Sequence, residues 1–250
     1  MKRIRRGFTL VEVSLFLAIT AAIFVSIAIG TQNSIFQQRY NDAVQSFAEF
    51  LRTVYSQVTN VQNESVGRSD KAIYGKLVVF GDEGGNNNIT SYNVIGGIGN
   101  VGSSSSTEVL EKLKSLGASI TDTGGPVGYV ENYKPRWGSQ IQTNRGWGAV
   151  ESDKYQLFTG ALLIVRHPSS GTVYTYTMKD NNDLYEAIKS GSKDPLIGLL
   201  DGDNFKLEEV NFCINPNGAE RSNLRRDVRI VEGARNASGI EIMPDGEECD

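Results

Sequence analysis

The feature that most limits the fold of this chain is an apolar segment close to its N-terminus. From Phe8 to Ile29 the segment has 22 residues, and Glu12 is the only charged residue among them. As a helix it would span roughly 33 Å, which is enough to cross the hydrocarbon core of a bilayer. A carboxylate in hydrocarbon costs on the order of 2.5–3.5 kcal/mol, so the position of Glu12 requires a physical reason.

The rest of the chain has the composition of a polar body. Only 39% of the 250 residues are hydrophobic, and no apolar run after Gly30 approaches membrane-spanning length. We therefore expect one N-terminal membrane segment that carries a large polar body. The leader before Phe8, MKRIRRG, holds four basic residues and no acidic one, so its removal leaves a more acidic chain. An acidic body disfavours broad nucleic-acid binding, which needs basic patches.

Two ordinary explanations of the N-terminus leave part of it unexplained. A secretory signal peptide has an apolar stretch of about 7–15 residues, whereas the stretch here is longer and is interrupted by Glu12. A plain transmembrane anchor fits the length, and the positive-inside rule places Met1 to Gly7 in the cytoplasm. That anchor gives Glu12 no role.

A third explanation accounts for every residue. The sequence Gly7-Phe8-Thr9-Leu10-Val11-Glu12, after a basic leader and before an apolar helix, closely resembles the type IV prepilin leader. Bacterial type IV pilins and the pseudopilins of type II secretion systems share this motif. The resemblance implies that a prepilin peptidase cleaves after Gly7 on the cytoplasmic side and N-methylates Phe8. It also implies partners in assembly, namely other pilin or pseudopilin subunits, a platform protein and an ATPase.

Cleavage would supply a partner for Glu12. It creates an α-amine on Phe8, whose ordinary pKa is about 8. An ammonium and a carboxylate are each costly in hydrocarbon and are tolerated as a pair. Residues 8 and 12 lie one helical turn apart, so they can pair within one chain. By resemblance, the amine of an incoming subunit meets Glu12 of its neighbour in a filament and sets the subunit register.

The pattern after the membrane segment predicts an α+β fold of the kind that pilins have. We expect residues 1–7 to be a cleaved leader, residues 8–30 a membrane helix, residues 31–63 its amphipathic continuation, and residues 64–250 a head outside the cytoplasm. In the continuation, apolar residues at steps of three and four mark one face, which should pack on an antiparallel β-sheet. The candidate strands are Lys76–Phe80, Ile89–Ile95, Leu162–Arg166, Thr172–Met178, Leu207–Ile214, Val228–Val231 and Ile240–Met243, and the candidate helices are Thr107–Leu116 and Asp183–Ser190.

The two cysteines, Cys213 and Cys249, both lie close to the C-terminus. If the head is outside the cytoplasm, a disulfide between them is expected, and the loop-rich surroundings favour it over two buried free thiols. The bridge would close a loop with 35 residues between the cysteines. In the chain-entropy model such a bridge stabilises the fold by roughly 3–4 kcal/mol.

Four further motifs suggest chemistry only weakly. The stretch Gly97 to Gly102 matches the dinucleotide-binding pattern G-x-G-x-x-G, and Asp122 follows it. However, the preceding strand is too polar for a central parallel strand, and the next helix starts too late to meet a pyrophosphate. A surface loop is therefore the preferred interpretation. The single histidine, His167, falls in a predicted hairpin turn and is expected to be exposed. Acidic turns at Asp180, Asp201 and Asp245 lack the spacing of a calcium loop and are read as solvated turns.

The fourth motif is an echo, Arg136-Trp137-Gly138 and Arg145-Gly146-Trp147-Gly148. Exposed tryptophan beside arginine is typical of a recognition surface, although two indoles that pin a loop to the head are the preferred interpretation.

The sequence therefore predicts a structural filament subunit with no catalytic activity, no cofactor and no metal. A type IV pilin is favoured over a pseudopilin. A minor pilin is favoured over a major one, because many major pilins carry a proline near the end of the membrane segment and here the first proline is Pro126. The alternative from another class is an anchored binding module outside the cytoplasm that keeps its leader and never polymerises. An enzyme is the most distant alternative.

Overall fold

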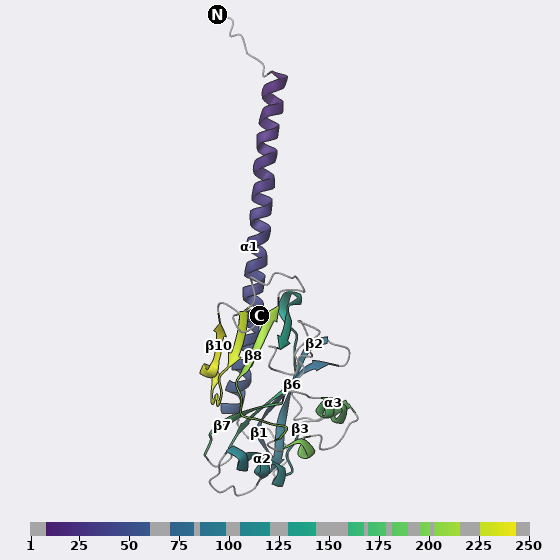
Figure 1. Cartoon of the computed structure of the whole chain (residues 1–250), viewed down its shortest axis with the longest axis vertical. Coiled ribbons are helices and arrows are strands. Elements are labelled where there is room, and N and C mark those ends of the chain that lie inside the picture. Colours follow the sequence, from purple (N-terminus) through teal and green to yellow (C-terminus); the bar gives the residue numbers. More distant parts are fainter. Residues whose placement is uncertain are drawn as a thin grey trace, which may run out of the picture. The chain divides into compact units, whose positions relative to one another are not determined.

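The structure, a computed structural model, describes residues 9–60, 71–82, 86–98, 106–120, 130–143, 160–167, 170–178, 182–189, 196–200, 203–215 and 226–243. The chain divides into two compact units, residues 1–42 and residues 43–250. The longest element, helix α1 (Leu10–Thr59), begins in the first unit and ends in the second (Figure 1). Proline is absent from α1 and Gly30 is its only glycine, so nothing strong interrupts its backbone hydrogen bonds.

The part of α1 that belongs to the second unit buries one face. The apolar side chains on this face are exposed by 1% or less, and they are Ala43, Val44, Phe47, Ala48, Leu51, Val54, Tyr55 and Val58. The ring of Phe47 lies 6.4 Å from that of Phe80 and 5.3 Å from that of Phe212, measured between centroids. These two contacts reach two different β-sheets, so the helix packs against both. The amphipathic pattern predicted for residues 31–63 is confirmed in this part, and α1 ends at Thr59.

The larger sheet is antiparallel and has strand order β3-β2-β1-β6-β7, with β4 also paired to β2. In Figure 1, β1, β6 and β7 run side by side. The residue bounds of its strands are β1 (Lys71–Asp82), β2 (Asn86–Gly97), β3 (Ser119–Ile120), β4 (Glu131–Tyr133), β6 (Gly160–Arg166) and β7 (Val173–Met178).

The smaller sheet is also antiparallel, with order β10-β9-β8-β5. Its inner face carries Phe212, which stacks on Phe80 of the larger sheet at 5.0 Å between ring centroids. Its strands are β5 (Gln140–Thr143), β8 (Val210–Asn215), β9 (Arg226–Ile230) and β10 (Ile240–Met243), and short 3-10 turns at Arg136–Gly138 and Ala237–Gly239 precede β5 and β10.

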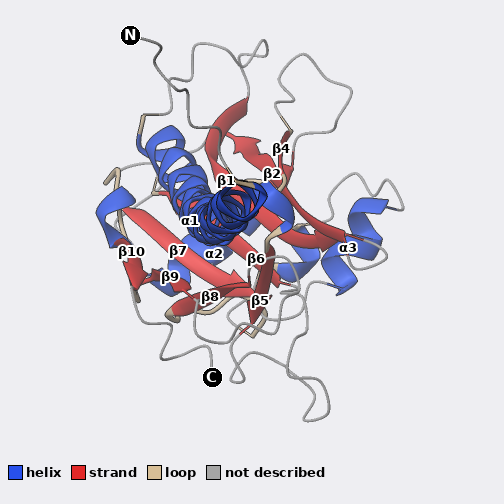
Figure 2. Ribbon diagram, turned by 90° about the horizontal axis from the view of Figure 1, so that it is seen from above, coloured by secondary structure: helices blue, strands red, loops and turns tan. Residues whose placement is uncertain are grey.

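A second core lies on the face of the larger sheet that α1 does not cover. Leu77, Leu163 and Tyr176 point from the sheet into this core, and Leu113 of helix α2 (Ser106–Ser115) and Leu184 of helix α3 (Asn182–Lys189) join them. A third short segment, the 3-10 turn Ile197–Leu199, also packs here. Figure 2 shows α2 and α3 in blue beside the red strands. The larger sheet is therefore covered on both faces.

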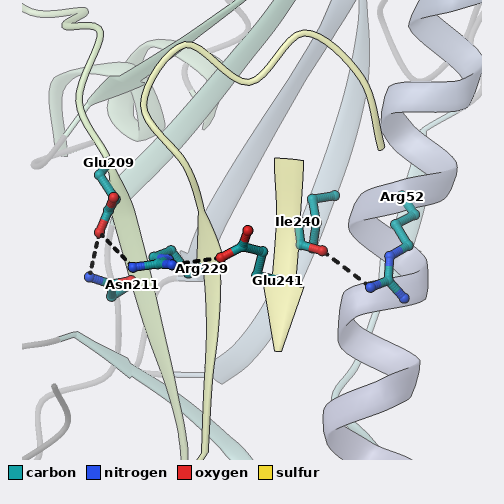
Figure 3. Close-up of polar contacts among 6 residues, drawn as sticks. All are labelled: Arg52, Glu209, Asn211, Arg229, Ile240 and Glu241. Carbon is teal, nitrogen blue, oxygen red and sulfur yellow. Dashed lines mark hydrogen bonds and ion pairs between the residues drawn. The ribbon is translucent and has the colours of Figure 1, made fainter. Parts of the chain in front are cut away.

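Polar side chains cross the outer face of the smaller sheet in one row. Asn211, Arg229 and Glu241 are register partners on β8, β9 and β10. Arg229 pairs with Glu241 at 2.6 Å and with Glu209 at 3.8 Å (Figure 3). At the same sheet, Arg52 of α1 donates a hydrogen bond to the carbonyl oxygen of Ile240 at 3.2 Å. Helix α1 is thus connected to the smaller sheet by a polar contact to β10 as well as by apolar packing on β8.

The predicted α+β class is confirmed at this level: a long N-terminal helix with antiparallel sheets. The hairpin formed by β6 and β7 and the helices α2 and α3 lie where the sequence predicts them, within a few residues. The prediction of a single sheet was wrong, because the strands divide into two sheets. The short strands β3, β4 and β5 were not predicted.

Candidate functional site

The first turn of α1 is closed by a reciprocal pair of hydrogen bonds. The backbone N–H of Thr9 donates to the Glu12 carboxylate at 2.8 Å, and the backbone N–H of Glu12 donates to the Thr9 hydroxyl oxygen at 3.3 Å. The Thr9 hydroxyl also donates to the same carboxylate oxygen at 2.9 Å. This is a capping box, in which Thr9 is the N-cap and Glu12 is the third helical residue. It satisfies two backbone donors that the helix itself cannot reach.

The capping box adds a role for Glu12 that the charge argument does not contain. The T-x-x-E spacing, followed by an apolar run, is the sequence signal that predicts it. The pairing of Glu12 with an α-amine on Phe8 stays a prediction, since Gly7 and Phe8 lie outside the described residues. Thr9 and an amine on Phe8 can both bind the Glu12 carboxylate, because each of its two oxygens accepts more than one hydrogen bond.

The membrane-length part of α1 exposes its apolar side chains. Exposed fractions run from 47% for Val13 to 85% for Leu10, and Phe16 and Phe24 are exposed by 66% and 72%. By length and composition, α1 is the one helix among the described residues that could cross a membrane. Side chains of this kind are stable only where another apolar medium covers them.

The hydroxyl groups in this part of α1 are compatible with such a medium. Each of them donates a hydrogen bond to a carbonyl three or four residues earlier in the helix, at 2.8 to 3.0 Å. A polar group that is satisfied within its own helix can enter hydrocarbon at little cost. The residues concerned are Ser14, Thr20, Ser26 and Thr31.

Only one of the two cysteines of the predicted disulfide, Cys213, belongs to the described residues. Cys213 lies on β8 and is exposed by 4%. Its register partners are Gln142 on β5 and Asp227 on β9, so it lies within the smaller sheet. Cys249 lies outside the described residues. The bridge stays a prediction.

The expectation that His167 is exposed was wrong, because its side chain is exposed by only 2%. Its ring atom Nδ1 accepts a hydrogen bond from the backbone N–H of Ser170 at 3.2 Å. The backbone of His167 bonds to Thr172 and Gly171, and Gly171 has φ of 70°. The imidazole therefore closes the β6–β7 turn from within.

Trp137 is partly exposed. Its side chain is exposed by 53% and its backbone has φ of 59°, which is rare for a residue with a side chain. Trp147 lies outside the described residues, so the echo as a whole is not tested.

The first residue of the glycine motif, Gly97, makes hydrogen bonds within the fold. The N–H of Gly97 donates to the Leu116 carbonyl at 2.8 Å, and its own carbonyl accepts from the Tyr74 hydroxyl at 2.7 Å. Both backbone groups of Gly97 are therefore used by the fold. Residues 99–102 and Asp122 lie outside the described residues.

Among the described residues, no group of three His, Cys, Asp or Glu side chains could hold a metal ion. The acidic turns at Asp180, Asp201 and Asp245 fall outside the described residues at their first aspartate. Searches against protein families, curated proteins and solved structures found no match to this chain.

Proposed function

We propose that the chain is a structural subunit, such as a minor pilin, of a bacterial type IV pilus-like filament. It assembles through α1 after cleavage behind Gly7 and N-methylation of Phe8. The observation that carries the proposal is the N-terminal sequence: a basic leader, the junction Gly7-Phe8, and an apolar helix in which Glu12 is the only charged residue. A pseudopilin of a type II secretion system is the nearest alternative.

The exposed apolar part of α1 supports a polymer. Its side chains need apolar cover that the chain itself does not provide in the first unit. A bilayer supplies such cover for a subunit that waits in the membrane. Neighbouring copies of α1 would supply it in a filament. The head, on this proposal, has the pilin arrangement of a helix end packed on antiparallel strands.

The capping box supports a specific role for Glu12 during maturation. Cleavage after Gly7 leaves the Thr9–Glu12 capping pair intact, because neither residue is removed. The new amine on Phe8 then joins a carboxylate that Thr9 already orients. The helix start is therefore organised before a neighbouring subunit docks.

The first experiment measures the intact mass of the chain from two fractions of the native bacterium, sheared surface filaments and membranes. We expect a chain that starts at Phe8 with one added methyl group in the sheared fraction. A chain that keeps Met1 and occurs only in membranes would contradict the proposal. The anchored binding module would then be the better account.

The second experiment separates the charge of Glu12 from its capping role. Glu12→Gln keeps an oxygen that can accept the Thr9 N–H, but it removes the charge. Glu12→Ala removes both, and Thr9→Ala removes the hydroxyl that caps the helix. We expect Gln and Ala at position 12 to reduce filament incorporation alike, with cleavage and membrane insertion intact. Normal filaments from Glu12→Ala would exclude the assembly role of Glu12.

A further inference from the structure

A partly buried polar cluster lies between α1 and the larger sheet. The Lys76 side chain on β1 is exposed by 8%, and its Nζ lies 3.5 Å from Oε2 of Glu131 on β4. The other oxygen of Glu131 accepts a hydrogen bond from the Gln57 amide of α1 at 2.8 Å. The cluster is on the face of the sheet that carries Phe80, four residues after Lys76, and so it lies under the helix.

The strand register places Asn93 beside Lys76, on the strand that separates Lys76 from Glu131. Strand β2 lies between β1 and β4, with Lys76 opposite Asn93 and Ser91 opposite Glu131. Strands β1 and β4 are about 10 Å apart, since each step between neighbouring strands is about 4.8 Å. The Lys76 and Glu131 side chains can meet only by reaching over β2. Residues directly opposite each other point to the same face, so the Asn93 side chain lies below this meeting point.

The surroundings make the Lys76 ammonium easier to deprotonate. Burial lowers the pKa of Lys76, and the Glu131 carboxylate opposes this change only in part. A neutral amine is a nucleophile, whereas an ammonium is not. The electrophile would be the carboxamide of Asn93, a residue exposed by only 8%.

We propose that Lys76 and Asn93 form an intramolecular isopeptide bond, with Glu131 as the proton carrier. This bond would join β1 to β2 covalently. It does not depend on the filament function, because all three residues belong to the head.

The reaction balances without an oxidant, a reductant or a cofactor. Glu131 accepts a proton from the Lys76 ammonium, and the neutral Nζ attacks the side-chain carbonyl carbon of Asn93. The C–N bond to Nζ forms, and the C–N bond to Nδ2 breaks. Glu131 returns its proton to the leaving amino group and relays a second proton to it from Nζ, so the products are the isopeptide, the Glu131 carboxylate and an ammonium ion. Holding the groups together supplies a high effective concentration, and the loss of ammonia makes the step irreversible.

The bond predicts a specific mass for the full-length chain purified from membranes. We expect its intact mass to be lower than the sequence requires by one ammonia molecule, after any leader cleavage and methylation are counted. A mass with no such deficit overturns the proposal. A deficit of one water molecule also overturns it, because that product would join Lys76 to a carboxylate.

A tryptic digest locates the bond. Trypsin cleaves after lysine only when the side-chain amine is free, and the next basic residue after Lys76 is Lys112. The linked chain gives one peptide, Ala72–Lys112, that contains both reacting residues and lacks one ammonia. The unlinked chain gives two peptides, Ala72–Lys76 and Leu77–Lys112, at full mass, and this result would contradict the bond.

Variants identify the reacting groups. Asn93→Ala and Glu131→Gln should restore the full mass of the chain, and Lys76→Arg should do the same. Asn132→Ala is the matched control, because it removes an exposed asparagine on β4 next to Glu131 and should keep the deficit. A deficit that persists in Asn93→Ala or in Lys76→Arg arises elsewhere and overturns the assignment. The masses are measured on denatured protein, so the result does not depend on whether a variant folds.

Discussion

The two halves of α1 both carry apolar side chains, but these side chains are covered from water in different ways. In the first half, large side chains from Leu10 to Ile27 are exposed by about half or more. In the second half, one face from Ala43 to Val58 is exposed by 1% or less, because two sheets of the same chain cover it. The sheets of the head cover the second half of the helix, whereas the first half needs an apolar surrounding that the head does not supply.

The polar groups of the two halves differ in the same way. Hydroxyls such as Thr20 bond to carbonyls within the first half of the helix. In the second half, the Tyr55 hydroxyl bonds to that of Thr175 on β7 at 2.7 Å, and Gln57 bonds to Glu131 on β4. Hydrogen bonds inside one helix suit a membrane, whereas hydrogen bonds to other strands fix the helix in a protein. The comparison therefore separates a segment that is apolar and long enough to cross a membrane from a segment that packs within the head.

The largest expected effect tests this difference with one substitution made in each half. Leu51→Ala removes a fully buried side chain and should lower the free energy of unfolding of the head by about 2–5 kcal/mol. Leu17→Ala, at a residue exposed by 61%, should change it by less than about 0.5 kcal/mol. Denaturant titration of the full chain in detergent measures both. Equal effects would mean that the two halves of α1 do not differ as described.

Local sequence patterns predicted the helices. The features that these patterns missed depend on contacts between residues far apart in the chain. The period of three and four residues around Phe47 and Leu51 is visible in the sequence because a helix repeats within a few residues. Strands β3, β4 and β5 have two to four residues, and their pairing depends on partners far along the chain. No local period can show such strands, nor can it show that they form two sheets.

The same limit explains the error at His167. The turn around His167 was predicted, but the burial of its ring depends on what packs against the turn. The Thr9–Glu12 capping box is different, because its T-x-x-E signal is local and could be read directly.

The second prediction concerns a covalent link that only the head would have. If Cys213 and Cys249 form the expected disulfide, reduction should lower the free energy of unfolding by about 3–4 kcal/mol. Denaturant titration with and without dithiothreitol measures this change, and the Cys249→Ser variant should lose its response to the reagent. Two cysteines that alkylate in unfolded protein without prior reduction would show that the bridge is absent.

The third prediction asks how much the polar contacts of α1 add to its apolar packing. Arg52→Met keeps an apolar stem and removes the hydrogen bond to the Ile240 carbonyl, so we expect a loss of about 0.5–1.5 kcal/mol. Glu49→Ala breaks only the exposed ion pair to Arg52 and should cost less than about 1 kcal/mol. A loss at Arg52 as large as that at Leu51 would show that polar contacts, rather than burial, hold this half of the helix.

The smallest expected effect concerns the face of the larger sheet that α1 does not cover. Burial raises the pKa of Tyr176, and the neighbouring Tyr174 adds to this change. The folded chain therefore keeps a phenol proton that the unfolded chain releases above pH of about 10, so stability falls as the pH rises beyond that value. Tyr176→Phe should reduce this fall, and Tyr174→Phe, at a half-buried residue, should change it less. Urea titrations at neutral and alkaline pH measure the slopes. An unchanged slope in Tyr176→Phe would mean that water reaches this core, and that α2 and α3 do not close it as α1 closes the other face.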